Sequence, residues 1–148
     1  MKHMRKISQS IIIIILCTLG IYLNSCKEDE TFTVFPTPVW RAEANPDYSV
    51  SMTATVVLPA NLATYMQPED QMAAFVGEEC RGLAYLVDNI YYLLIKGSPG
   101  EQPQISIRYY SSRNQYMYTT DAIITFEADG VYGTTDNPVT LPLSIINK

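Results

Sequence analysis

The sequence has 148 residues, with ten Lys or Arg and fifteen Asp or Glu, a net charge of −5. Its length is that of one domain. An acidic chain repels phosphate backbones, so nucleic acid is excluded as an expected partner. The one histidine is His3, so the rest of the chain holds no Ser-His-Asp or Cys-His catalytic set and no histidine-ligated zinc site.

The first 25 residues have the build of a secretory signal peptide. Three basic residues, Lys2, Arg5 and Lys6, precede an apolar run over residues 11–23, which is the order found in such signals. This run of 13 residues would form a helix of roughly 20 Å, whereas a transmembrane helix needs about 20 residues. We therefore expect residues 1–25 to be removed, which leaves a net charge of −8.

The residues at the end of this leader resemble the lipobox of bacterial lipoproteins. They read Leu23-Asn24-Ser25-Cys26, with Asn24 as a mild departure from the usual small residue. The resemblance implies cleavage before Cys26, diacylglycerol on its thiol, and usually a further acyl chain such as palmitate on its amine. Several acyl chains anchor a protein durably in a membrane.

An acidic run, Lys27-Glu28-Asp29-Glu30, follows the lipobox cysteine. It resembles the export signal of surface-exposed lipoproteins of the Bacteroidetes. The resemblance implies an outer-membrane protein that faces the cell exterior. We expect residues 26–38 to be an acidic tether and residues 39–148 to be the folded domain.

The first half of this domain predicts four strands. Apolar and polar residues alternate over residues 50–58, the period of a strand with one buried face. After a short helical turn at residues 61–66, mostly apolar runs over residues 71–76, 81–87 and 90–96 predict three more strands. Asp88-Asn89 is a turn pair between the last two.

The second half continues the pattern after a loop at residues 97–100. Strands are predicted over residues 105–110, 115–119, 122–128 and 139–145, and Pro142 makes the last an edge strand. About eight short strands with no long helical pattern predict an all-β domain. We expect an antiparallel β-sandwich, immunoglobulin-like or jelly-roll-like, or a small barrel.

One stretch, Ala74-Phe75-Val76-Gly77-Glu78-Glu79-Cys80-Arg81-Gly82, resembles a motif of small β-sandwich domains in secreted and lipid-anchored Bacteroidetes proteins. That family has no agreed activity, so the resemblance implies only the fold and an envelope location. The residues themselves predict a tight connection between Gly77 and Gly82. They also predict a buried Cys80, without a disulfide partner after Cys26, and an Arg81 paired with Glu78 or Glu79.

The candidate function is non-catalytic binding at the cell surface, with glycans as the first candidate ligand. Sugar rings stack on exposed aromatic side chains, and Trp40, Tyr48, Tyr116 and Tyr118 are the candidates; Arg81 is a candidate ligand contact. Ordinary packing of these side chains is the alternative. The glycan hypothesis loses its basis if Trp40 is buried and the tyrosines form no contiguous exposed patch.

Two other functions are open. A structural or assembly subunit of an envelope or adhesin complex would offer an unprotected sheet edge to a partner's strand. A hydrolase with a carboxylate pair is the least favoured, because the members of Glu69-Asp70 and of Glu78-Glu79 are adjacent and would point to opposite faces of a strand. Asp88, Asp129 and Asp136 lack the spacing of a calcium site, and no metal or cofactor is expected.

The lipid anchor predicts the outcome of replacing the cysteine sulfur by oxygen. The Cys26→Ser chain should keep its leader, because a hydroxyl does not accept the lipid. It should therefore be absent from the processed lipoproteins that detergent extracts from the membrane. Membrane fractionation and the mass of the mature N-terminus measure this. Normal processing and membrane retention of the variant would contradict the prediction.

Overall fold

The computed structural model describes residues 31–147. The predicted signal peptide and Cys26 lie outside these residues. From Phe32 onward the chain forms one compact unit, which is all-β apart from one short helix. No helix among residues 31–147 is both long enough and apolar enough to cross a membrane.

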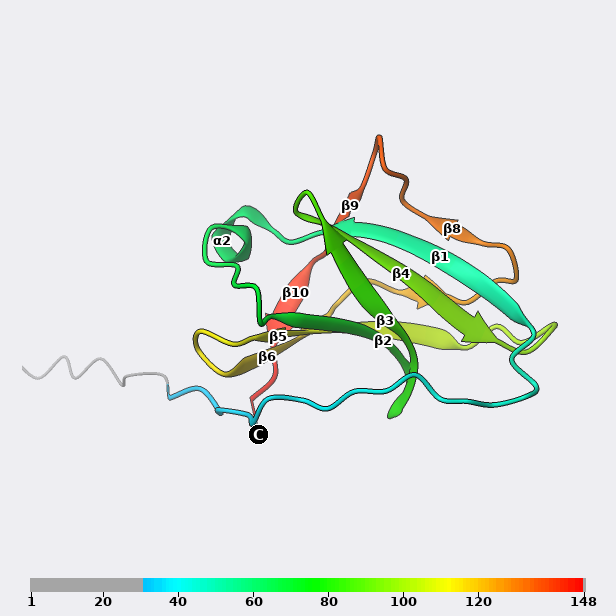
Figure 1. Ribbon diagram of the computed structural model, residues 1–148, viewed down its shortest axis with the longest axis horizontal. Coiled ribbons are helices and arrows are strands. Elements are labelled where there is room, and N and C mark those ends of the chain that lie inside the picture. Colours follow the sequence, from blue (N-terminus) through cyan, green and yellow to red (C-terminus); the bar gives the residue numbers. More distant parts are fainter. Residues whose placement is uncertain (1–30, 148) are drawn as a thin grey trace, which may run out of the picture. The chain divides into compact units, whose positions relative to one another are not determined.

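Ten strands make up the described part of the chain, and Figure 1 shows how they form one curled, mixed sheet. In chain order they are β1 (Val50–Val57), β2 (Gln71–Val76), β3 (Glu79–Val87), β4 (Ile90–Gly97), β5 (Gln104–Ser111), β6 (Tyr116–Thr120), β7 (Ile124–Thr125), β8 (Val131–Tyr132), β9 (Val139–Thr140) and β10 (Leu143–Ile145). The helix α2 (Ala60–Ala63) follows β1. Across the sheet the order is β10-β6-β5-β2-β3-β4-β1-β8, with β7 beside β5 and β9 beside β1.

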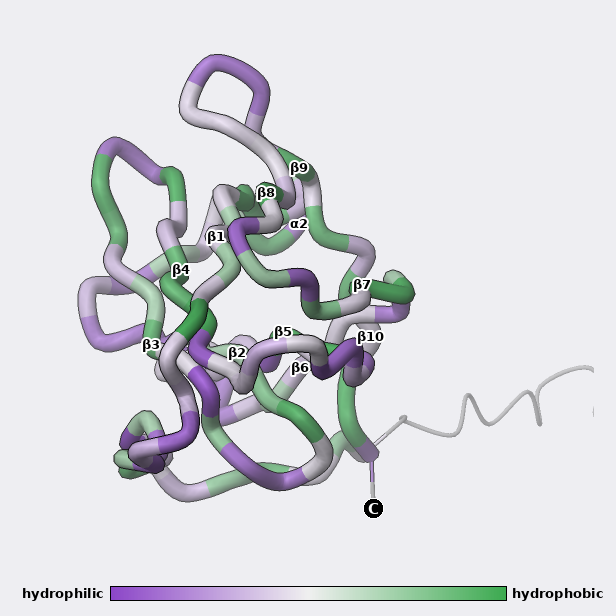
Figure 2. The backbone as a smooth tube through the Cα atoms, turned by 90° about the vertical axis from the view of Figure 1, so that its right-hand side faces the viewer, coloured by the Kyte–Doolittle hydropathy of each residue, from purple (hydrophilic) through white to green (hydrophobic). Residues whose placement is uncertain are grey.

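The expectation of an all-β domain is confirmed, but the expectation of a purely antiparallel arrangement is wrong. Both β8 and β9 pair with β1 in parallel. After β7 the chain crosses from β5 to β1. The strands β8 and β9 then run in the same direction as β1. Figure 2 shows β8 and β9 beside β1, joined by a loop coloured hydrophilic.

Two predicted strands are interrupted in the structure. Of residues 122–128 only β7 pairs, with β5. Residues 139–145 divide into β9 and β10, which belong to different parts of the sheet. Pro142 lies between these two strands and has no backbone N–H to donate, so the ladder stops there.

The strand β3 changes its partner half-way along. Its first residues pair with β2, through Leu83 opposite Ala73, and its last four, from Ala84, pair with β4. A β-bulge with Arg81 as the extra residue lies within the pairing of β3 with β2, shortly before this change. Bulges bend a strand and increase its twist, so the bulge turns β3 toward β4, and the sheet divides into two halves where β3 changes its partner.

The main core contains side chains from both halves. Alternate residues of β1, β4 and β5 point into it, as the period of two requires. Its buried members include Ala54, Val56, Leu93, Ile95, Met72, Ala74, Ile105, Ile107, Tyr109, Ile124, Phe126 and Leu141. This burial is the main stabilising term of the fold.

A second, smaller core lies on the other face of β2. It consists of Ala73, Phe75 and Cys80, and Trp40 packs against it. The extended segment that begins at Phe32 covers this face: the Phe35 N–H donates to the Gln115 carbonyl and the Glu43 N–H to the Cys80 carbonyl, each at 2.8 Å. Part of the predicted tether, residues 32–38, therefore contacts the folded domain.

The close approach of β3 to β4 depends on Gly82. A Cβ atom at this position would lie 2.3 Å from the Leu94 carbonyl oxygen, well inside contact distance. Gly77, the other glycine of the motif, has φ +60° in the turn before β3, where a side chain is disfavoured. Both glycines thus bracket a tight connection, as the sequence predicts.

We expect Gly82→Ala to lower the free energy of unfolding by about 3 kcal/mol, because the backbone of β4 must move to admit the methyl group. Urea unfolding followed by Trp40 fluorescence measures this, since Trp40 is the single tryptophan. Gly100→Ala is the control. Gly100 has φ +78° but no atom within 4 Å of the added Cβ, so only backbone strain of about 1 kcal/mol is expected. Equal losses in the two variants would contradict the steric argument.

Candidate functional site

Trp40, the first predicted ligand contact, lies half-buried on the smaller core. Its ring meets the Phe75 ring edge to face, with centroids 5.4 Å apart. The Arg108 guanidinium also contacts Phe75, at 4.3 Å from the ring centre. Trp40 is therefore mainly a packing residue, with one part of its ring left accessible.

The two tyrosines predicted beside it lie on the opposite face of the sheet. Tyr118 is half-buried against Tyr109 of the main core, with ring centroids 5.9 Å apart. Tyr116 packs against Phe32 at 5.5 Å. Because Trp40 covers the smaller core and Tyr118 the main core, the structure does not bring these three aromatic residues into one patch.

Arg81, the fourth predicted contact, is buried, with only 6% of its surface exposed. One guanidinium nitrogen lies 2.8 Å from the Glu101 carboxylate and donates to the Lys96 carbonyl at 3.2 Å. Its Nε lies 2.8 Å from Glu79 Oε1, although the N–H does not point at that oxygen. The Tyr48 ring covers the guanidinium at 3.8 Å.

These contacts make Arg81 the centre of a structural network. The Tyr48 hydroxyl donates to Glu79, and this bond raises the pKa of Tyr48 above its ordinary value. Partial desolvation works to raise the pKa of Glu101, but bonds from the Ser98 N–H and Arg81 outweigh it and hold that pKa below its ordinary value. Because the guanidinium is buried, covered by the Tyr48 ring and paired with Glu79 and Glu101, Arg81 has little access to a ligand.

The side chains of Glu78 and Glu79 are turned toward different arginines. Glu78 is turned toward Arg108, which it contacts at 2.7 Å, whereas Glu79 is turned toward Arg81. Among the described residues no group of three or more His, Cys, Asp or Glu side chains is placed to hold a metal ion. Asp88, Asp129 and Asp136 are exposed in separate turns.

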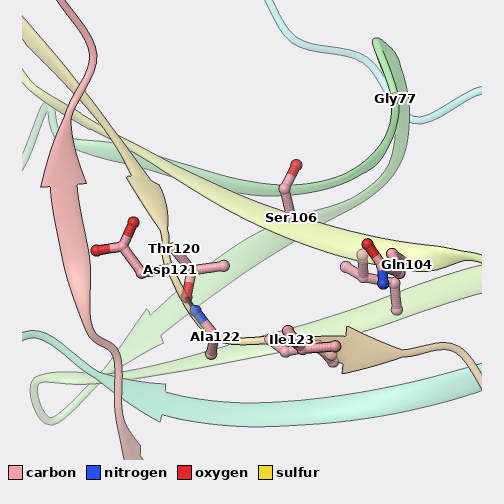
Figure 3. A pocket seen from close by; sticks show the side chains of 9 residues that line it. Gly77, Gln104, Ser106, Thr120, Asp121, Ala122 and Ile123 are labelled. Atoms are coloured by element: carbon pink, nitrogen blue, oxygen red, sulfur yellow. Dashed lines mark hydrogen bonds between the residues drawn. The ribbon is translucent and has the colours of Figure 1, made fainter.

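A pocket of about 380 Å³ lies beside the first residues of β5, at the connection between β6 and β7. Figure 3 shows Gln104, Ser106, Thr120 and Asp121 at this place. Asp121 accepts a hydrogen bond from Ser144 of β10, and Thr120 accepts one from the Ala122 N–H. The polar groups are thus partly engaged, and they do not converge on one point.

A second hollow of about 320 Å³, the β2–β3 groove, opens where β3 leaves β2 after Leu83. In Figure 1, β2 and β3 diverge beyond their paired residues, and α2 lies near the end where the two strands are farthest apart. Most of the lining is apolar. The lining residues are Trp40, Pro68, Asp70, Gln71, Met72, Leu83, Ala84, Tyr85, Leu86 and Tyr91.

Asp70 is the one charged residue of this lining. Its carboxylate accepts hydrogen bonds from the Ser112 N–H at 2.8 Å and hydroxyl at 2.7 Å, from the Gln67 N–H at 2.9 Å and from the Tyr109 hydroxyl. Burial, and then this bond to Asp70, raise the pKa of Tyr109 above its ordinary range, so its hydroxyl remains a donor. Every donor to Asp70 is neutral.

Beside the groove, apolar side chains are exposed on the outer surface of β3 and β4. We call the set Leu83, Tyr85, Val87 and Leu94 the β3–β4 face. Tyr85 is 73% exposed, Val87 53% and Leu94 49%. No described element covers this face. The sequence does not reveal the β3–β4 face, because a strand that is buried on both faces and a strand with one uncovered face can have the same apolar composition.

Comparisons with protein-family models, curated proteins and solved structures found no match to this chain. The resemblance to small envelope domains of the Bacteroidetes therefore stays a prediction, as does the lipobox.

The network around Arg81 predicts a stability defect. Arg81→Met keeps much of the apolar stem but leaves Glu79 and Glu101 without their cation, so we expect a loss of about 3 kcal/mol in the free energy of unfolding. Both carboxylates are partly exposed, which keeps the loss at the lower end for buried pairs. Urea unfolding measures it.

Arg41→Met is the matched control, because Arg41 is exposed. It should change the stability by less than about 0.5 kcal/mol. A loss for Arg81→Met no larger than this would show that the network contributes nothing, and would reopen a ligand role for the guanidinium.

Proposed function

We propose that this chain is a lipid-anchored, non-catalytic binding domain on the outer surface of a bacterial outer membrane, and that its ligand is another protein. The observation that carries the choice of ligand is the uncovered β3–β4 face. Exposed contiguous apolar surface on an otherwise acidic protein is typical of a protein-interaction site. The role is that of an assembly or accessory subunit of an envelope complex.

Glycan binding is the second candidate. It is supported by the position of Trp40, which lines the β2–β3 groove and also a pocket of about 270 Å³ with Arg108 and Glu78. It is weakened by the separation of Trp40 from Tyr116 and Tyr118, because a platform for several sugar rings needs neighbouring aromatic faces. We therefore rank it below protein binding.

We also propose that the fold is a β-sandwich. The two halves of the curled sheet would act as the two layers of a β-sandwich, joined through β3. This interpretation is supported by the main core, to which Ala54 and Leu93 from one half and Ile107 and Tyr109 from the other contribute. The lipobox-like sequence that ends at Cys26 and the acidic run after it support the envelope location.

Photo-crosslinking in living cells tests the protein ligand. A photoreactive phenylalanine analogue at Tyr85 should give a covalent adduct with another envelope protein, because Tyr85 lies on the β3–β4 face. The same analogue at Ile123, which is 82% exposed at the other pocket, is the control and should give none. Adducts are detected by immunoblot and identified by mass spectrometry.

Two results would contradict the proposal. One is the absence of a protein adduct at Tyr85 together with binding of the chain on a glycan array. The other is an equal yield of adducts at Tyr85 and Ile123, which would indicate random encounter on the cell surface.

A further inference from the structure

The last four residues of β3 form an unprotected strand edge. Ala84, Tyr85, Leu86 and Val87 pair with β4 on one side, whereas the pairing with β2 on the other side ends at Leu83. Along such an edge, alternate residues direct their backbone N–H and C=O groups outward. Folded proteins usually protect an edge with a charge, a proline or a bulge, and these four residues contain no charge and no proline.

A second strand edge lies across the β2–β3 groove. Gln71 and Met72 pair with β5 on one side, and on the other side β3 has already turned away. Both edges line the same space of about 320 Å³. The groove therefore presents backbone donors and acceptors on two walls, with apolar side chains from Trp40 and Tyr85 around them.

The size and borders of this space select the kind of occupant. It narrows toward the pairing of Leu83 with Ala73 and is limited on its far wall by residues 68–72. A single extended segment fits between two strand edges, since neighbouring strands lie about 4.8 Å apart.

The charge of the groove is negative. Asp70 is its one charged lining residue, and no Lys or Arg among residues 31–147 lies within ion-pair distance of it. Glu69 and Asp88 are exposed next to the groove, at the turn before β2 and at the end of β3. The Asp70 carboxylate accepts four hydrogen bonds, all from neutral donors, so a cationic side chain entering the groove would meet a negative charge that no cation balances.

We propose that the β2–β3 groove binds one extended segment of a partner protein as an added strand on β3, and that this segment carries a Lys or Arg that pairs with Asp70. The inference rests on the proposed function and deepens it by naming the form and charge of the ligand. Main-chain hydrogen bonds to β3 supply affinity, and alternate side chains of the added strand contact the groove.

Peptide titration of the full chain, isotopically labelled and held in detergent micelles, tests the proposal by NMR. The probe is the peptide Lys-Val-Thr-Val-Thr-Val-Lys, at up to millimolar concentration. The amide signals of Ala84–Val87 should shift, and those whose N–H groups point away from β4 should gain protection from hydrogen exchange. A peptide with Glu in place of both Lys should bind about fivefold more weakly, the size expected of one partly exposed ion pair.

Three control experiments separate strand addition from general stickiness. A peptide with Pro in place of both Thr keeps the charge but loses backbone donors, and it should not bind. Tyr85→Lys places a positive charge at the edge and should weaken binding of the basic peptide about tenfold. Ile123→Lys, a matched change at an exposed apolar residue elsewhere, should leave binding unchanged.

The proposal is overturned if the amides of Ala84–Val87 do not respond at millimolar peptide, or if the proline peptide binds as well as the probe. It is also overturned if those amides are protected by concentration-dependent dimers of the chain, seen by analytical ultracentrifugation. If strand binding fails while the adduct at Tyr85 in cells persists, the protein-binding function stands and the partner instead docks on the β3–β4 face.

Discussion

The fold depends on one strand that belongs to both halves of the sheet. β3 pairs with β2 at its start and with β4 at its end, and the bulge at Arg81 is where it changes direction. Two features make the change possible: Gly82 lets the backbone of β4 approach, and the Arg81 guanidinium fixes the β4–β5 loop through Glu101. The core between the halves can close only because β3 turns there.

The same bend creates the candidate binding site. A strand that paired with β2 along its whole length would have no free edge and would leave no groove. Because β3 leaves β2 after Leu83, the residues from Ala84 to Val87 keep one unpaired side, and the side chains of Tyr85 and Val87 remain exposed outside the core. The stabilising network around Arg81 and the accessible edge of β3 thus both follow from the bulge in β3.

Local features of the fold were predictable from the sequence. The two-residue turn at Asp88-Asn89, the limits of β2, and the special roles of Gly77 and Gly82 follow from residue type and period. Long-range pairing was not predictable. The contact of Arg81 with Glu101 joins residues twenty positions apart, and no periodicity reports it. Pro142 was predicted to mark an edge, but not to send β9 and β10 to different partners.

The candidate site was missed for a related reason: single-sequence patterns describe which side chains are apolar, not which of them another strand covers. Trp40 was a candidate for stacking against sugar rings, with ordinary packing as the alternative. In the structure it mainly covers the smaller core. The segment around it has a mechanical meaning. Tension applied to the chain ahead of Phe32 would reach the domain first through the contact of Phe32 with Tyr116, the bonds of Thr33 to Asn147 and the bond of Phe35 to Gln115. These contacts, rather than the main core, would bear the load, so the first part of the segment would separate from the domain before Trp40 parted from Phe75.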